Sequence, residues 1–313
     1  MTPPTTPSKL ASTPLEELWF GEDDAHAIDA QAAASFAAVL ADLEGLRPFS
    51  DVARRVLQYV ADPNFEVARL QSIMEQDPAL ATRILRLANS AAFRPREPCA
   101  SIRQAIMVLG SRTLTEVATS LSMMAMFSDL SGVGRLVRDH CASTAALVRS
   151  LALNKENAGP NCYIVGLLHD FGKLLLIQAQ PATYLKIHGP QVAEPDTIHL
   201  HERAVLGFDH AVLGAHLLKK WSLPDPIPKV VAWHHQLSRA LAAGGEVALY
   251  VALVRLAERI DRLLASDDPP SPEQTERMAA SSECAYLGFG ERDLGKLWVE
   301  LRAVKQEAQQ IFR

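Results

Sequence analysis

Residues 166–174 (GLLHDFGKL) place a histidine and an aspartate side by side at the end of an apolar run, followed closely by Gly172 and Lys173. If this segment is helical, adjacent residues lie about 100° apart around the helix axis, so both side chains can converge on one point beside it. Imidazole and carboxylate are ordinary ligands of first-row divalent metals. Because a single His-Asp pair is common by chance, the prediction of a metal site depends on further ligands from other elements.

Histidines elsewhere in the chain could supply those ligands. Five of the ten histidines lie on or beside predicted helices, at His140, His169, His210, His234 and His235. A buried histidine is usually satisfied by an ordinary hydrogen bond, so each of them has a purely structural interpretation as well. The remaining histidines are given that interpretation, with His216 a partly exposed helix residue and the others being His26, His188, His199 and His201.

The composition is that of a globular protein. The chain has 313 residues, 48% hydrophobic and 21% charged, enough for two domains or one large one. A net charge of -5 gives no electrostatic footprint for nucleic acid. The four cysteines lack paired zinc-type spacing, which favours reduced thiols. The N-terminus has no apolar signal region and no apolar run reaches about 18 residues, so we expect a cytoplasmic protein without a membrane span.

Caps and breaks divide the chain into short helices. Residues 1–14, rich in Pro, Ser and Thr, are predicted to be a disordered tail, and residues 15–45 a helical extension. Asp77-Pro78 is a helix start and Gly110 a helix stop. Strand-like alternation is almost missing from the sequence, so we predict an all-α fold.

Later segments continue this pattern. Helices are predicted over 135–153, 162–178, 209–221, 227–235 and 247–264, with an irregular stretch from Pro181 and two closing helices over 273–313. Met123, Met124 and Met126 are interpreted as adaptable packing, and their helix is the best choice for an interface between copies.

Several stretches resemble the HDOD signalling domain, an all-α relative of the HD phosphohydrolases and of the HD-GYP cyclic-dinucleotide phosphodiesterases. They are DPALATRILRLANSAAF, SIRQAIMVLG, GLLHDFGKLLL, FDHAVLGAHLLKKWSLP and WHHQ, in that order. The resemblance covers residues 46–264 and implies a helical N-terminal subdomain (46–130) packed on an HD-like helical domain (131–264). Residues 265–313 are then extra C-terminal helices.

The resemblance also implies a metal-ligand set. His140 stands at the first helix histidine, His169 with Asp170 forms the signature pair, and Lys173 matches the lysine that assists at phosphate in the enzymes. The further ligands implied by the resemblance are His210, His234, His235 and Glu258. One or two divalent ions such as Fe or Mn are the implied cofactor, with Asp170 bridging two ions.

The chain departs from the enzyme pattern at three places. Gln236-Leu237-Ser238 stands where the Gly-Tyr-Pro motif would be, and Leu136 replaces an acidic ligand upstream of His140. Glu258 replaces an aspartate and is one methylene longer.

Three interpretations follow from these residues. The favoured one is a regulatory module that has lost catalysis and that acts by binding a signalling protein or a ligand. The alternative is a metal-dependent phosphohydrolase or phosphodiesterase acting on a nucleotide or cyclic dinucleotide, in which Asp170 and Lys173 are catalytic. In the third, the histidines form a hydrogen-bonded core cluster without any metal.

Overall fold

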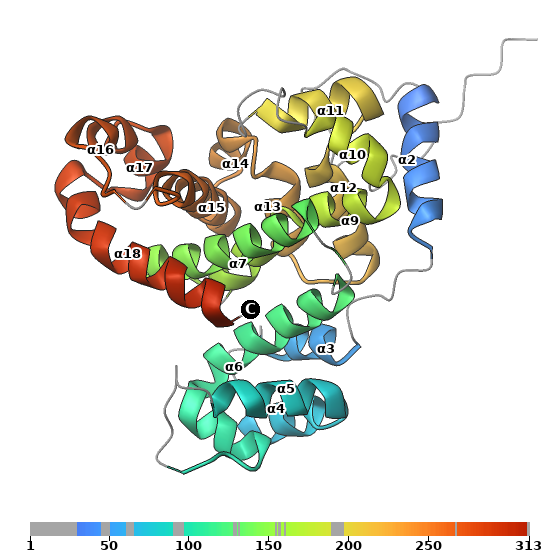
Figure 1. The fold of residues 1–313 in the computed structure, drawn as a ribbon, viewed down its shortest axis with the longest axis vertical. Helices are drawn as coiled ribbons and strands as arrows, with labels where there is room; N and C mark the ends of the chain where they lie inside the picture. The colour runs from blue at the N-terminus through green and yellow to red at the C-terminus, as the bar shows by residue number, and fades with distance from the viewer. Residues whose placement is uncertain are drawn as a thin grey trace, which may run out of the picture.

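A computed structural model describes residues 30–44, 51–60, 66–89, 97–127, 130, 132–153, 155, 158–159, 161–188, 197–266 and 268–311. The predicted tail at 1–14 lies outside these residues. The described part is helical, without strands, so the all-α prediction is confirmed. Figure 1 shows a lower lobe built from α3 to α6 beneath a larger lobe that contains the remaining helices.

The lower lobe has its own small apolar core. It consists of α3 (Asp51–Val60), α4 (Val67–Met74), α5 (Pro78–Ala88) and the first part of α6 (Ile102–Met126). The side chain of Asp77 accepts a hydrogen bond from the Leu80 amide, which caps α5 as the sequence predicts. The buried residues of this core include Leu70, Met74 and Ile84.

Helix α6 joins the two lobes. Gly110 sits inside it at φ 77°, a backbone conformation that glycine adopts without penalty, and this kink separates the two helices predicted on either side of it. Beyond the kink, the Ser120 hydroxyl lies 2.9 Å from the Tyr163 hydroxyl, and Arg149 of α7 donates to Glu116 at 2.9 Å. The predicted packing of a helical N-terminal subdomain on an HD-like domain is therefore confirmed.

The upper lobe is built around three buried segments. These are α7 (Val133–Ala152), the pair α8 (Cys162–Leu168) and α9 (Phe171–Ala179), and α15 (Gly245–Leu263), with α12 (His210–Lys220), α13 (Ile227–Trp233) and α14 (Leu237–Ala243) around them. They share one apolar core, in which Leu147, Leu168 and Val254 are fully buried.

The signature pair does not lie within a continuous helix, and this corrects the predicted helix 162–178. His169 and Asp170 form a turn between α8 and α9, with Asp170 at φ -99° and ψ 14°. Because of this turn, the side chains of His169 and Asp170 lie in the middle of the core without belonging to one face of a continuous helix.

The same stretch, Cys162–Ala179, is long and apolar enough to cross a membrane, which corrects the expectation that no such run exists. However, 83% of it is buried inside the protein, as in a core helix. The four cysteines are free, as predicted, and all four are buried. Met123 is fully buried, which supports its interpretation as core packing rather than as part of an interface.

Helices α10 and α11, together with α2, lie at one edge of the upper lobe. The stretch predicted to be irregular from Pro181 instead begins with α10 (Pro181–Ile187), followed by α11 (Ile198–Leu206). Helix α2 (Ala30–Asp42) packs against α9 and α11 at the edge of this lobe, away from its sequence neighbour α3 (Figure 1). The Phe36 ring meets Phe208 edge-on at 5.0 Å.

The chain closes with α16 (Pro272–Ala279), α17 (Ser282–Leu287) and α18 (Glu291–Ile311). A capping box between Ser271 and Gln274 starts α16. The long helix α18 lies along α7 and leads back toward the middle of the molecule (Figure 1). The predicted extra C-terminal helices are thus confirmed, as three helices rather than two.

Candidate metal centre

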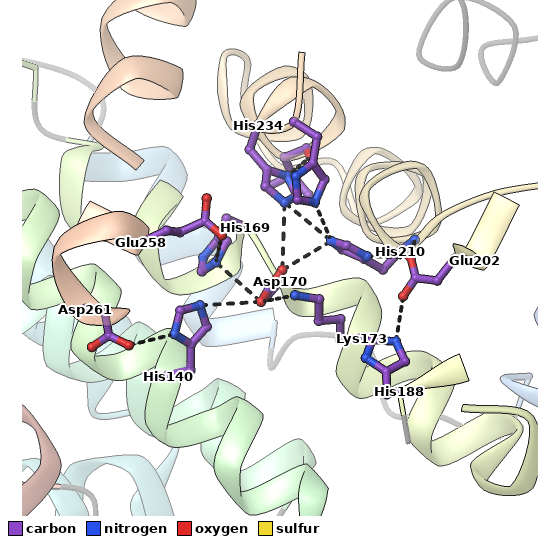
Figure 2. A network of polar contacts seen from close by, with 12 residues as sticks. His140, His169, Asp170, Lys173, His188, Glu202, His210, His234, Glu258 and Asp261 are labelled. Atoms are coloured by element: carbon purple, nitrogen blue, oxygen red, sulfur yellow. Dashed lines mark hydrogen bonds and ion pairs between the residues drawn. The ribbon is translucent and has the colours of Figure 1, made fainter. Parts of the chain in front are cut away.

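Asp170 lies at the centre of the candidate site, and its two carboxylate oxygens face different groups (Figure 2). Oδ1 lies 3.2 Å from His210 Nε2 and 3.7 Å from His234 Nε2. Oδ2 lies 3.5 Å from His169 Nε2 and 3.6 Å from His140 Nε2. The carboxylate is 1% exposed, so it separates two histidine groups inside the protein.

The ligand groups around Asp170 form two sets. His210, His234 and His235 make up the first set, and His140, His169 and Glu258 the second, with the ligand atoms in each set within 4.8 Å of one another. Every residue predicted as a metal ligand therefore belongs to one of the sets or, as Asp170, lies between them.

A close approach of α9 and α12 brings Asp170 and His210 together. Gly172 and Gly214 face each other where these helices meet, and a Cβ on Gly172 would overlap the carbonyl oxygen of His210. A Cβ on Gly214 would lie 3.0 Å from the Gly172 nitrogen. Glycine is therefore required in both sequence motifs for packing.

Backbone carbonyls orient two of the rings. His169 Nδ1 lies 2.7 Å from the Gly166 oxygen, and His234 Nδ1 lies 2.7 Å from the Val231 oxygen. A carbonyl can only accept, so each Nδ1 carries the hydrogen and each Nε2 of the neutral ring presents a lone pair to the centre of the site.

Carboxylates orient two more rings. His140 Nδ1 lies 3.0 Å from Asp261 Oδ2, and His210 Nδ1 bonds to Glu202, whose Oε2 also accepts from the His210 amide at 2.8 Å. Glu202 is fully buried and accepts a further hydrogen bond from His188 at 3.0 Å. Such carboxylate–histidine pairs commonly support a metal ligand from its outer side.

The inward-facing atoms are all acceptors unless a cation or a proton lies among them. His169 Nε2 and Asp170 Oδ1 are buried and have no hydrogen-bond partner within the described residues. His210 Nε2 lies 3.1 Å from His235 Nε2 and 3.4 Å from His234 Nε2. Two nitrogens at these separations, each about 2.1 Å from one ion, subtend an angle of about 95–110° there, as ligands of a single metal do. The residues therefore fit a divalent cation.

Burial and the neighbouring charged groups shift the pKa values of the histidines in the site. Burial lowers the pKa of His210, but the Glu202 carboxylate outweighs it and raises the pKa to about 9. At His169, burial lowers the pKa, but the Asp170 carboxylate outweighs burial and the pKa is raised. Burial and the neighbouring imidazoles hold the pKa of His234 and His235 well below the usual value. Nearby carboxylates thus favour the protonated forms of His210 and His169 in the metal-free site, where bound cations would replace these protons.

Lys173 provides a fixed positive charge at Asp170. Its ammonium donates to Asp170 Oδ2 at 2.7 Å, and its side chain is 13% exposed. Burial would raise the pKa of Asp170, but Lys173 and His169 hold it well below the usual value. Lys173 is thus placed beside the Asp170 carboxylate at the centre of the two ligand sets.

Sequence reasoning missed three supporting residues. Asp261 lies one turn after Glu258 on α15, a spacing that places both on one helix face and could have suggested a shared role. Glu202 and His188 come from α11 and the end of α10, where the sequence predicts no ordered site. The sequence gives no ligand role to His188, but His188 contacts Glu202, and Glu202 in turn bonds to the predicted ligand His210.

The other histidines remain outside the two ligand sets. His199 stacks on His235 with ring centroids 4.2 Å apart, and His216 is half-buried on α12, as expected. His26 lies outside the described residues. The interpretation of the histidines as a metal-free hydrogen-bonded cluster would require protons between the Nε2 atoms that face one another.

Comparison with known proteins identifies a sequence family that matches most of this chain. The sequence model of the HDOD domain matches residues 46–237. An uncharacterised protein of Treponema pallidum is 26% identical over 183 residues, which are 58% of this chain and 36% of that protein. The chain thus spans about a third of the length of this curated relative.

Solved structures share the fold. A candidate phosphohydrolase of Shewanella amazonensis is 20% identical with a TM-score of 0.70, covering 88% of this chain and 98% of its own. An HDOD domain protein of unknown function from Geobacter sulfurreducens is 21% identical with a TM-score of 0.64 and the same coverages, 88% and 98%. A candidate signal transduction protein of Marinobacter aquaeolei is 18% identical with a TM-score of 0.66, covering 91% of this chain and 67% of its own.

Proposed function

The chain belongs to the HDOD domain family, a group of HD-superfamily signalling modules, and we propose that it senses a phosphate-containing ligand through a two-metal centre bridged by Asp170. The proposal includes divalent cations such as Mn or Fe as cofactor. It takes the signal to be ligand occupancy, read by a protein partner, and requires no turnover.

The observation that carries this proposal is the division of ligands around Asp170. One carboxylate oxygen faces His210 and His234, and the other faces His140 and His169. A carboxylate with one oxygen toward each of two ligand sets is suited to bridge two ions. A structural histidine cluster would instead pair donors with acceptors.

The donor set indicates the class of metal. Imidazole nitrogen and carboxylate oxygen suit first-row ions, and no thiolate lies among the ligands of either set, which argues against a structural zinc site. Each set with one Asp170 oxygen supplies four protein groups. Six-coordinate ions would therefore retain positions for water or for oxygens of a ligand.

The ligand class follows from charge. Two cations and the Lys173 ammonium concentrate positive charge at one partly open site, where the side chain of His140 is 25% exposed and that of Glu258 is 13% exposed. Phosphate oxygens satisfy both divalent ions and ammonium groups. A nucleotide or a cyclic dinucleotide has the required phosphates.

A second candidate function is hydrolysis of such a ligand by the same site. The placement of Lys173 favours it, because the ammonium could neutralise charge that develops on a phosphoryl group. Bound ions would supply a water of lowered pKa as nucleophile. Asp170 and Lys173 would then be the catalytic residues, with Glu202 and Asp261 fixing the ring orientations.

Two sequence features favour binding over turnover. Gln236 follows the paired histidines in place of the Gly-Tyr-Pro motif, and its side chain accepts a hydrogen bond from Arg239 at 3.2 Å. Leu136, in place of an acidic ligand, is 67% exposed. The enzyme pattern is therefore altered at the edge of the site, while six of the seven inner groups are retained and the seventh, Glu258, replaces an aspartate.

Metal content and ligand turnover test the proposal together. Protein purified without chelator and reloaded with Mn²⁺ should contain about two ions per chain and bind cyclic di-GMP or a generic phosphodiester without hydrolysing it. Reproducible hydrolysis that is abolished in Asp170→Ala would establish the second candidate instead. A chain that stays metal-free after loading would contradict both.

A further inference from the structure

A chain of polar contacts leads from the second ligand set to the C-terminal helix. His140 Nδ1 donates to Asp261 Oδ2 at 3.0 Å, and the Lys305 ammonium lies 2.9 Å from Asp261 Oδ1. Lys305 also donates to the Asp261 carbonyl at 2.7 Å, which satisfies one of the free carbonyls at the end of α15. Helix α18 therefore fixes both the side chain and the backbone of the residue that orients His140.

These contacts are shielded from solvent. The side chains of Lys305 and Asp261 are 12% and 13% exposed. Burial would raise the pKa of Asp261, but the hydrogen bond from His140 and the Lys305 charge hold it below the usual value. Removing the Lys305 ammonium would leave Asp261 Oδ1 without its charged partner, so the carboxylate that orients His140 would be held by one contact fewer.

A second chain of contacts leads from the first ligand set to α17. Arg255 Nη1 donates to the His234 carbonyl at 3.2 Å, and Arg255 Nε donates to Glu283 at 2.8 Å. Arg259 donates to the other oxygen of Glu283 at 3.3 Å, and Glu283 is 2% exposed. Each ligand set is thus held from outside by one C-terminal helix.

We propose that α17 and α18, which follow the region matched by the HDOD sequence model, are positioning elements for the metal centre and couple its occupancy to the docking of the C-terminal segment. Lys305 and Glu283 are the positioning residues. The proposal rests on the two-metal site of the proposed function and goes beyond it by assigning the regulatory input or output to the C-terminal helices.

The coupling must act in both directions. If docked α18 increases the affinity of the second ligand set for a cation, bound cation stabilises docked α18 by the same free energy. A partner that displaces α18 would release that cation. Conversely, metal and ligand binding would order α18 for a partner.

Two variants of α18 separate a specific contact from general helix anchoring. Lys305→Met removes the ammonium and retains the aliphatic stem. Arg302→Met is the matched control, because Arg302 anchors the same helix through the carbonyls of Ser266 and Asp268, each at 2.8 Å, without touching the site. Lys305→Arg is the conservative variant expected to restore the contact.

The readouts are Mn²⁺ affinity by isothermal titration calorimetry and hydrogen exchange of the α18 amides. Lys305→Met should weaken one of the two Mn²⁺ sites by about 10–100-fold, the cost typical of losing an outer support of a ligand, and leave the other unchanged. Arg302→Met and Lys305→Arg should bind both ions nearly as the unmodified chain does. Glu283→Gln should weaken the other site, and Mn²⁺ should slow exchange in α18 of the unmodified chain and of the two control variants but not of Lys305→Met.

The outcomes distinguish this inference from the proposed function. Two unchanged Mn²⁺ sites in Lys305→Met, with α18 exchange still slowed by Mn²⁺, would overturn the coupling and leave the metal centre standing. Equal weakening in Arg302→Met would also overturn it, because only general anchoring would then matter. A full chain that binds no Mn²⁺ would contradict both proposals. If Lys305→Met does not fold, the exchange measurement on the unmodified chain decides alone.

Discussion

The two lobes of the molecule are both helical but bury different chemistry. The core of the lower lobe is apolar, with the polar residues Thr115 and Glu116 of α6 buried beside it, whereas the upper lobe buries charged and titratable groups throughout its centre. In the upper lobe these groups include His169, Asp170, Glu202, His210 and His234. Burying such groups costs free energy unless each is paired or coordinates a metal, so their concentration in one lobe supports the proposed metal centre there.

The largest effect is expected at Asp170, whose carboxylate we propose to bridge the two ions. Asp170→Asn removes the negative charge shared by both ligand sets, so we expect loss of both Mn²⁺ sites in metal analysis after loading. Glu75→Gln, the same chemical change on the exposed surface of the lower lobe, should bind both ions. Retention of two ions in Asp170→Asn would show that the sets do not depend on a shared bridge.

A cavity made in the apolar core of the lower lobe tests whether that lobe contributes stability without contributing to metal binding. Ile84→Ala in α5 removes a fully buried side chain and should lower the free energy of unfolding by about 2–5 kcal/mol. Chemical denaturation measures this loss. The folded protein should still bind the same amount of Mn²⁺, and a loss of metal in this variant would mean that the lobes are not separate in function.

Disturbing the close contact of α9 and α12 should have a smaller effect on stability and on Mn²⁺ binding. Gly172→Ala inserts a methyl group against the His210 carbonyl, so we expect a loss of about 1–3 kcal/mol in stability and weaker Mn²⁺ binding. Gly295→Ala is the matched control, because a Cβ at Gly295 on α18 meets nothing within 4 Å. Unchanged Mn²⁺ affinity in Gly172→Ala would argue that this contact does not set the ligand geometry.

The smallest effect concerns the contact between the lobes. Arg149 donates to the buried Glu116 of α6 at 2.9 Å, and the Arg149 side chain is 38% exposed. A double-mutant cycle with Glu116→Gln and Arg149→Met should give a coupling energy of about 1 kcal/mol. A coupling energy near zero would mean that this ion pair does not help to join the lobes.

Much of this organisation could be predicted from the sequence. Caps such as Asp77 and the apolar periodicity predict the helices, because both signals are local. The ligand residues could be named because five histidines and two carboxylates stand in motifs that resemble one family. The same local signals were wrong at His169-Asp170, where the structure has a turn inside the helix that the apolar run predicts.

The supporting residues could not be predicted because their roles depend on distant parts of the chain. Lys305 contacts Asp261 from 44 positions away, and Glu202 reaches His210 from a stretch without a clear helical pattern. A lysine on an amphipathic helix looks like any solvated charge until the fold shows what it faces. Such outer contacts require the three-dimensional structure.

Anomalous X-ray diffraction from Mn²⁺-loaded crystals tests the central claim most directly. The account predicts two anomalous peaks about 3.5–4 Å apart, the spacing of two-metal sites, with the Asp170 carboxylate between them. One peak should lie among His210, His234 and His235, and the other among His140, His169 and Glu258. Peaks confined to other parts of the molecule, or an empty map around Asp170, would contradict the two-metal centre.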